Sequence, residues 1–292
     1  MLMWSRRERA GNVAAEFDHL VLTKFNILTT PEYGPAARRL EDAWLERRLA
    51  EFETFSLPSL RSQSTKTFRW LIFCDDESPQ WFKDRMASYG PPVEPVFVSG
   101  MTNATMGALL RDRGYTGARP LITTRVDNDD ALAIDFIEAV QSEYAGQDRV
   151  FINFPWGLRA CDGALFTGHW SSNPFMSLIE QPSADGAFLG VYFRQHHLVK
   201  KTEKVVNVRR PPSWIRAMHT SNTVQTQVGL PRLADRSSLF EIDWNRLPEP
   251  PSMARKILIS ANGYRARLQR SSKFKRLMGK RISQAASGGS SS

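Results

Sequence analysis

The sequence predicts an α/β fold in which helices cover both faces of a mixed, mostly parallel sheet, giving three layers. Over about the first half of the chain, apolar β-branched runs alternate with segments whose apolar residues recur every three to four positions. Alternation of this kind favours parallel strands joined by helices. With 292 residues, 41% of them hydrophobic, the chain can form one large domain or two small ones.

The first half contains predicted strands that are each followed by a predicted helix. The strands are residues 17–28, 67–73, 93–98 and 120–126. Pro95 lies in the third strand and favours an edge position, because proline cannot donate a backbone hydrogen bond. The first predicted helix begins at Pro35 and ends before Pro58, and the second begins at Ser78–Pro79. The third and fourth cover residues 103–113 and 131–144.

The second half contains short apolar runs separated by turns, and helical patterns are scarce there. We expect strands at residues 150–154, 164–167, 187–193, 204–208 and 214–218, and a helix at 175–180. These strands are expected to extend the same sheet in antiparallel or mixed fashion. The predicted organisation is one domain over residues 17–247, a basic helical tail over 248–283, and a disordered end over 284–292.

The net charge of +9 is concentrated near the C-terminus. Residues 252–283 contain ten Lys or Arg and no Asp or Glu, so the rest of the chain holds 29 of the 39 basic residues against 30 acidic ones. Such a tail indicates a partner surface, for which an anionic membrane is our main expectation and nucleic acid is not expected. No apolar run has the length of a membrane span, and no signal peptide is recognisable. Cys74 and Cys161 lack CxxC spacing, which fits the reducing cytoplasm. With the basic tail, we expect a cytoplasmic protein that touches the inner membrane face.

Acidic residues cluster directly after the strand at residues 120–126. Asp127, Asp129 and Asp130 repel one another unless a cation, a helix N-terminus or water offsets their charge. Magnesium and manganese prefer such oxygens and leave positions open for phosphate. An EF-hand calcium loop does not fit, because Leu132 stands where its glycine is required. The alternative is that these residues only cap a helix.

Other residues offer weaker signals. Asp75 and Asp76 follow the second strand and are candidates for nucleotide binding, or else form a solvated turn. His219 is a candidate third metal ligand, or else a structural histidine. Glu180 or Asp185 is a candidate general base, and the alternative is an exposed carboxylate. The candidates for binding a diphosphate are Arg111, Arg113 and Arg125, which pair equally well with the nearby aspartates.

Several familiar motifs are missing from the sequence. It has no GxxxxGK[ST], GxGxxG, GxSxG or HExxH pattern. P-loop ATPases, standard dinucleotide enzymes, serine hydrolases and zincins are therefore not leading candidates.

The predicted strands and the acidic residues that follow them form a recognisable pattern. The chain resembles the rhamnosyltransferase family of bacteria, within the GT-A type of nucleotide-sugar glycosyltransferases. The resemblance extends from about Leu22 to Asn222 and is carried by LTKFNI, FETFSLPSLRSQ, FRWLIFCDDESP, TTRVDNDDAL, NPFMSLIE and WIRAMHTSN.

The resemblance implies a Rossmann-like GT-A domain that transfers a sugar, rhamnose by the family's name, from a nucleotide-sugar to a glycan or lipid-linked acceptor. It implies a divalent metal, manganese or magnesium, held by Asp127 and Asp129 with His219 nearby. It also implies nucleotide contacts from Asp75 or Asp76. The family's usual base motif is not evident here. The competing hypothesis is a non-catalytic protein that binds a membrane surface or nucleic acid through its basic tail.

Overall fold

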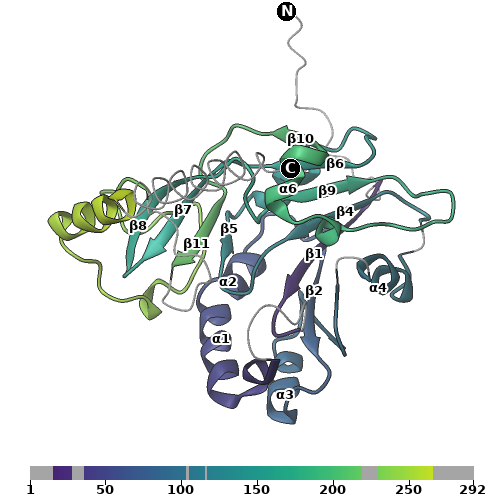
Figure 1. The fold of residues 1–292 in the computed structure, drawn as a ribbon, viewed down its shortest axis with the longest axis horizontal. Helices are drawn as coiled ribbons and strands as arrows, with labels where there is room; N and C mark the ends of the chain where they lie inside the picture. The colour runs from purple at the N-terminus through teal and green to yellow at the C-terminus, as the bar shows by residue number, and fades with distance from the viewer. Residues whose placement is uncertain (1–15, 28–35, 103–104, 116, 219–228, 266–292) are drawn as a thin grey trace, which may run out of the picture.

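A computed structural model of the chain describes residues 16–27, 36–102, 105–115, 117–218 and 229–265 (Figure 1). The main sheet has seven strands in the order β10-β6-β9-β4-β1-β2-β3. Its strands are β1 (Asp18–Lys24), β2 (Arg69–Asp75), β3 (Val93–Val98), β4 (Leu121–Arg125), β6 (Val150–Asn153), β9 (Ser177–Glu180) and β10 (Lys204–Asn207). Every neighbouring pair is parallel except the two that involve β9, which runs antiparallel to both β4 and β6.

The strand order contains a reversal beside β1. The chain passes from β1 to β2 and then to β3, and returns to place β4 on the other side of β1. The parallel register pairs Leu22 with Arg125, so Lys24 at the end of β1 is level with Asp127 just beyond β4. Open α/β sheets bind ligands at such a reversal, outside the carboxyl ends of the strands.

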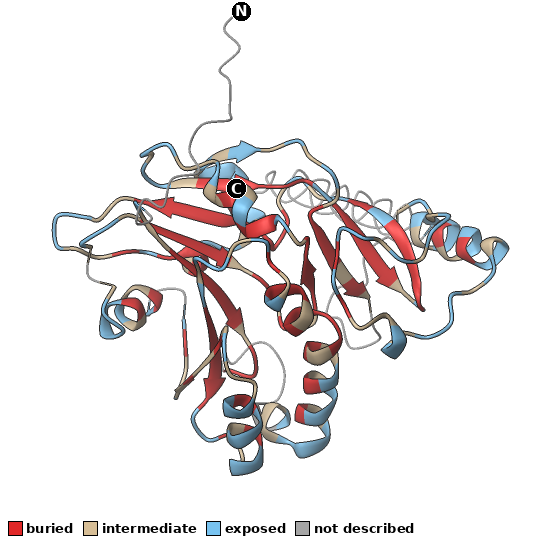
Figure 2. Cartoon of the chain, turned by 180° about the vertical axis from the view of Figure 1, so that it is seen from behind, coloured by how far each residue is buried: buried red, intermediate tan, exposed pale blue. Residues whose placement is uncertain are grey.

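Helices cover both faces of this sheet. One face packs against α1 (Asp42–Thr54), α2 (Ser56–Arg61), α3 (Gln80–Ser88) and α5 (Phe136–Gln141). The other packs against α4 (Met106–Asp112), the short 3-10 helix η2 (Val191–Phe193) and α6 (His196–Thr202). Two more 3-10 helices are η1 (Ala36–Leu40), before α1, and η3 (Trp244–Arg246). Apolar side chains of the strands alternate between the two faces, so the central strands are buried on both sides (Figure 2).

A second, four-stranded sheet lies beside the first. Its order is β5-β11-β7-β8, with β5 (Ala131–Leu132), β11 (Trp214–Met218), β7 (Trp156–Cys161) and β8 (Ala164–His169). Trp214 is fully buried, stacks on Phe175 with ring centroids 5.0 Å apart, and donates a 2.8 Å hydrogen bond from Nε1 to the Phe154 carbonyl. A Cβ added to Gly157 would lie 2.1 Å from this indole, so the close approach requires glycine at that position.

Residues 253–265 form a helix against the second sheet. Lys256 pairs with Asp235, and Ser260 Oγ donates a 2.8 Å hydrogen bond to the Gly229 carbonyl. Ile259 packs against a small apolar cluster that includes Phe166. The predicted tail therefore begins as a docked helix, and its remainder lies outside the described residues. No helix in the described part of the chain is long and apolar enough to cross a membrane.

The predicted α/β fold with a mixed, mostly parallel sheet between helical layers is confirmed. The edge position of the strand with Pro95 is also confirmed, since β3 ends the sheet. Pro58 does not end the helical region. A new helix, α2, begins at Ser56 and accommodates Pro58 in its first turn, where no backbone donor is required.

The second half differs more from the prediction. Residues 177–180 form strand β9, because their run is buried throughout and a continuous apolar run fits a buried strand as well as a helix. Residues 187–193 were expected as a strand and contain only η2. The helix expected from residue 131 begins at Phe136, since Ala131 and Leu132 pair with β11. Trp156–Cys161 is a strand that the pattern did not predict, and it belongs to a separate sheet.

Candidate functional site at the carboxyl ends of β1 and β4

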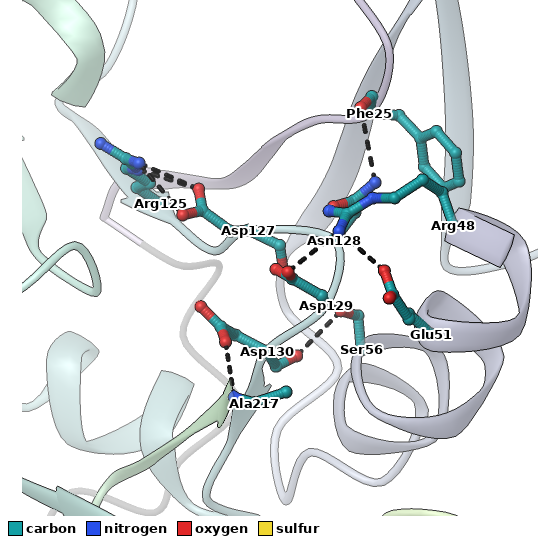
Figure 3. A network of polar contacts seen from close by, with 10 residues as sticks. All are labelled: Phe25, Arg48, Glu51, Ser56, Arg125, Asp127, Asn128, Asp129, Asp130 and Ala217. Atoms are coloured by element: carbon teal, nitrogen blue, oxygen red, sulfur yellow. Dashed lines mark hydrogen bonds and ion pairs between the residues drawn. The ribbon is translucent and has the colours of Figure 1, made fainter. Parts of the chain in front are cut away.

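The acidic stretch forms a turn that is fixed by backbone contacts. Ser56 Oγ on α2 lies within hydrogen-bonding distance of the carbonyls of Asp127 (3.2 Å) and Asp130 (2.8 Å). Asn128 is buried, and its Nδ2 lies 3.4 Å from the Phe25 carbonyl at the end of β1 (Figure 3). The first helices and the first strand thus hold the turn, so its side chains start from a fixed backbone.

Each carboxylate of the turn has a partner in the protein (Figure 3). Asp127 accepts two hydrogen bonds from Arg125 Nη2, at 3.0 and 3.1 Å. Asp129 pairs with Arg48 Nη1 at 3.0 Å, and Arg48 also contacts Glu51 and Asn128. Asp130 Oδ1 accepts a 3.0 Å hydrogen bond from the backbone N–H of Ala217 on β11. Arg125 and Arg48 therefore offset much of the repulsion expected among the neighbouring aspartates.

Asp130 differs from the other two aspartates in its burial. Only 3% of the residue is exposed, and burial raises its pKa well above the ordinary value, with a further rise from the charges of Asp129 and Asp127. Arg216 acts in the opposite direction but does not cancel the effect. The buried Asp130 side chain ties the turn to β11 through the Ala217 N–H.

The described residues do not fit a divalent cation as they stand. Within them, no three His, Cys, Asp or Glu side chains are arranged to hold a metal ion. Asp127 and Asp129 are each engaged by an arginine, which would have to release them before they could bind a cation. His219, the predicted third ligand, lies outside the described residues.

Cations gather around the buried ring of Tyr192 at the same edge. Lys24 Nζ lies 4.3 Å from the ring centroid, and Arg125 Cζ lies 5.2 Å from it. The Tyr192 hydroxyl donates a 3.2 Å hydrogen bond to the Leu22 carbonyl, which fixes the ring. Burial lowers the pKa of Lys24 to about 8, and the neighbouring Arg125 charge lowers it further than Asp127 raises it. The place where the strand order reverses, between β1 and β4, therefore carries two partly desolvated cations that lie close together. We call this place the switch point.

A third cation comes from the second sheet. Arg216 on β11 lies over the ring of Trp170, with its Cζ 5.0 Å from the ring centroid. His196, at the start of α6, meets the same ring edge-on at 5.5 Å. Burial lowers the pKa of His196 to about 4, followed by the charges of Arg125 and others, so its imidazole is neutral at pH 7. The neutral imidazole adds no charge of its own between the guanidinium groups of Arg125 and Arg216.

Of the two aspartates predicted to bind the nucleotide, Asp75 is buried and paired within the protein, whereas Asp76 is exposed to solvent. Asp75 is 1% exposed and forms an ion pair with Arg39. Its carboxylate accepts a 2.9 Å hydrogen bond from Arg39 Nε and a 3.0 Å hydrogen bond from the Glu77 N–H. These contacts close the turn after β2. Asp76 is exposed at the end of the strand. Of the two, Asp76 is the carboxylate that a ligand can reach.

Glu180, Asp185 and Arg111 lie away from the acidic turn. Because β9 is antiparallel, Glu180 pairs with Leu121 at the start of β4, at the opposite end of the strand from Asp127. Its carboxylate accepts two 2.9 Å hydrogen bonds from the N–H groups of Leu189 and Gly190. Asp185 lies on the exposed loop beyond, where Ser183 donates to it and lowers its pKa, and Arg111 interacts with it. Glu180 thus lies at the far end of β4 from Asp127, and Asp185 and Arg111 interact with each other away from the acidic turn.

Sequence reasoning missed several residues of this edge: Lys24, Arg48, Tyr192, His196 and Arg216. Lys24 had a usable signal, because it ends an early strand and the carboxyl ends of parallel strands meet at one edge. Tyr192 had none, since residues 187–193 were expected to form a strand, and His196 lies just beyond that segment. A network of polar contacts from α1, α2 and β11 completes the site (Figure 3).

The chain belongs to the family described as "Putative rhamnosyl transferase", whose model matches residues 17–230. This match defines the class of protein as glycosyltransferase-like and confirms the family resemblance of the sequence. No curated protein matches the chain.

Among solved structures, S. aureus TarS 1-349 in complex with UDP-GlcNAc is 10% identical, covers 70% of this chain and 59% of its own, and has a TM-score of 0.37. The T. maritima inositol-1-phosphate CTP transferase is 9% identical, covers 70% of this chain and 89% of its own, and has a TM-score of 0.30. The match thus spans less than two thirds of the length of the TarS chain.

Proposed function

We propose that this protein is a GT-A type glycosyltransferase that moves a sugar from a nucleotide-sugar donor to a glycan or lipid-linked acceptor. Rhamnose is the sugar that the family description suggests. The observation that carries the proposal is the reversal of strand order between β1 and β4, which sets Lys24, Arg125 and Asp127 at the carboxyl ends of adjacent strands. A donor with an anionic diphosphate suits this place, because cations and strand ends converge there.

The roles we propose follow from the position of each group. The donor diphosphate lies at the switch point, near Arg125, and the base or ribose lies toward Asp76 beyond β2. Asp127 and Asp129 face the same edge and hold the arginines that line it. They remain the candidates for a divalent cation, manganese or magnesium, together with His219. No step of the proposed transfer is assigned to a metal, because the described carboxylates are already paired.

We also propose that the helix at residues 253–265 contacts an anionic membrane from the cytoplasmic side. Ile257 and Leu258 are 55% and 58% exposed on this helix. The adjoining segment at residues 229–235, held to the helix through Gly229 and Asp235, exposes Leu230 and Leu233. Exposed apolar side chains within a strongly basic region suit the surface of an anionic bilayer. The free thiols Cys74 and Cys161 agree with a reducing compartment.

A thermal-shift screen tests the proposed donor class. UDP-, GDP- and dTDP-sugars are added to the full chain with and without manganese. A ligand present at 100 times its Kd stabilises the folded state by about 2.7 kcal/mol, which raises the melting temperature by several degrees. We expect one nucleotide class to do so and to release nucleoside diphosphate when acceptor is added. If no donor shifts the melting temperature and none is consumed, the proposed function is wrong.

A further inference from the structure

We propose that Lys24, Arg125 and Arg216 form a pyrophosphate-binding site, so that protein cations offset the charge of the donor diphosphate. The inference rests on the proposed function and adds to it the groups that bind the diphosphate. Lys24 and Arg216 stand outside every role that the sequence suggested. Lys24 and Arg125 come from adjacent strands, β1 and β4, and share the ring of Tyr192. Arg216 comes from β11 and shares the ring of Trp170 with His196, whose imidazole also senses the charge of Arg125.

The first argument is the placement of Lys24 and Arg125. The register sets Lys24 level with Asp127, at the strand ends where ligands bind in open α/β sheets. Both cations lie against the ring of Tyr192, at 4.3 and 5.2 Å from its centroid. Because Tyr192 is 3% exposed and bonded to the β1 backbone, the ring holds both cations in place before any ligand arrives.

The second argument is the state of Arg216. Its Nη1 is buried and has no hydrogen-bond partner. Buried N–H groups are nearly always paired, so this one calls for an acceptor. Asp130 senses the charge of Arg216, but its carboxyl is itself buried and accepts the Ala217 N–H. A phosphate oxygen is an acceptor that matches a guanidinium both in charge and in geometry.

The third argument is the charge balance of this edge. Asp127 is committed to Arg125, and Asp129 to Arg48. Among the described residues, neither Lys24 nor Arg216 forms an ion pair with a carboxylate; Asp127 acts on Lys24, and Asp130 on Arg216, only through charge at longer range. The like charges of Lys24 and Arg125, which lie against the same ring, are unfavourable on their own. A diphosphate would give Lys24 and Arg216 the directly bonded anionic partner that they lack.

Isothermal titration calorimetry with inorganic pyrophosphate tests the inference on the full chain in EDTA. We expect the wild type to bind pyrophosphate more tightly than phosphate. Lys24→Met and Arg216→Met should each weaken binding roughly ten- to a hundredfold, since each removes a charge-assisted hydrogen bond. Lys204→Met, an exposed lysine on β10, is the matched control and should bind like the wild type.

Conservative variants guard against misfolding. Lys24→Arg and Arg216→Lys keep the charge and should retain most of the affinity. Equal affinity of the Met variants and the wild type would overturn the inference, as would pyrophosphate binding that appears only when manganese is added. The proposed function fails separately: tight pyrophosphate binding without consumption of any nucleotide-sugar supports the site and contradicts the transferase, whereas consumption with unaltered Met variants does the reverse.

Discussion

The two sheets of this protein solve different packing problems. The seven-stranded sheet is covered by helices on both faces, so its central strands are largely apolar on both sides and its charged groups lie at the strand ends. The four-stranded sheet packs around Trp214, Phe240 and small residues, and its outer side carries the helix at residues 253–265 with Ile257 and Leu258 exposed. The seven-stranded sheet therefore carries charged groups at its edge, whereas the four-stranded sheet carries exposed apolar side chains on its docked helix.

The difference indicates a division of labour. A sheet buried on both faces provides rigid strand ends, and rigid ends can hold Lys24, Arg125 and Asp127 at fixed positions. A thin sheet with one docked helix leaves apolar side chains in water, where a membrane surface can cover them. The sheets meet at the site itself, because β11 supplies both the Ala217 N–H and Arg216.

The largest effect is expected at the carboxyl edge of the large sheet. In the double variant Asp127→Asn with Asp129→Asn, Arg125 and Arg48 lose their charged partners, and the groups facing the donor lose their positions. We expect donor turnover to fall by about a hundredfold or more. The assay measures nucleoside diphosphate release from the best donor of the thermal-shift screen.

Glu180→Gln is the control for that experiment, because Glu180 lies at the other end of β4 and accepts backbone hydrogen bonds there. Its turnover should stay within about threefold of the wild type, the range of context effects away from a site. A loss in Glu180→Gln as large as in the double variant would remove the contrast between the two edges.

A smaller effect is expected in stability, inside the large sheet. His19 on β1 is buried next to Thr124, with Nε2 2.8 Å from its Oγ1, and burial lowers its pKa from 6.5 to about 3. The folded protein therefore keeps His19 neutral while the unfolded chain takes up a proton below pH 6.5. Stability is complete above that pH and is lost as the pH falls, by about 2 kcal/mol at pH 5.

Urea unfolding at pH 7.5 and pH 5 measures this dependence. The variant His19→Gln should lose less stability on acidification than the wild type, by roughly that 2 kcal/mol. His169→Gln, at an exposed position on β8 of the small sheet, should keep the dependence of the wild type. Identical acid sensitivity in wild type and His19→Gln would show that His19 is not the group responsible.

The smallest effect is expected at the surface of the small sheet. In Ile257→Gln with Leu258→Gln, two exposed apolar side chains are lost and the basic residues are kept. Partition onto vesicles with anionic lipid should fall roughly tenfold, because full burial of an apolar side chain is worth about 1.5 kcal/mol or more and these two, 55% and 58% exposed, have about half of that left to gain. Flotation of the full chain with anionic and neutral vesicles measures it. Val206→Gln, exposed on β10, should float as the wild type does, and equal flotation of the double variant would exclude this face as the contact.

Part of the site was predictable because its signal is local. An apolar run that ends in DNDD identifies a buried strand with acids at its end, and β4 with Asp127 and Asp129 lies as expected. The β2 strand with Asp75 and Asp76 follows the same pattern. The helix pattern after Pro35 holds as well, and it carries Arg48, although nothing in its spacing revealed the contact with Asp129 across the fold.

The sequence by itself determined the alternation of strands and helices, the edge strand with Pro95 and the acidic turn after β4, since these depend on periodicity and on neighbours in the chain. Only the tertiary structure decided the direction of β9, which takes Glu180 to the far end of the sheet, and the existence of a second sheet. It also decided which cations meet at Tyr192 and Trp170. Those contacts join residues that are far apart in sequence, and their free energy comes from burial and charge in three dimensions, which no local pattern encodes.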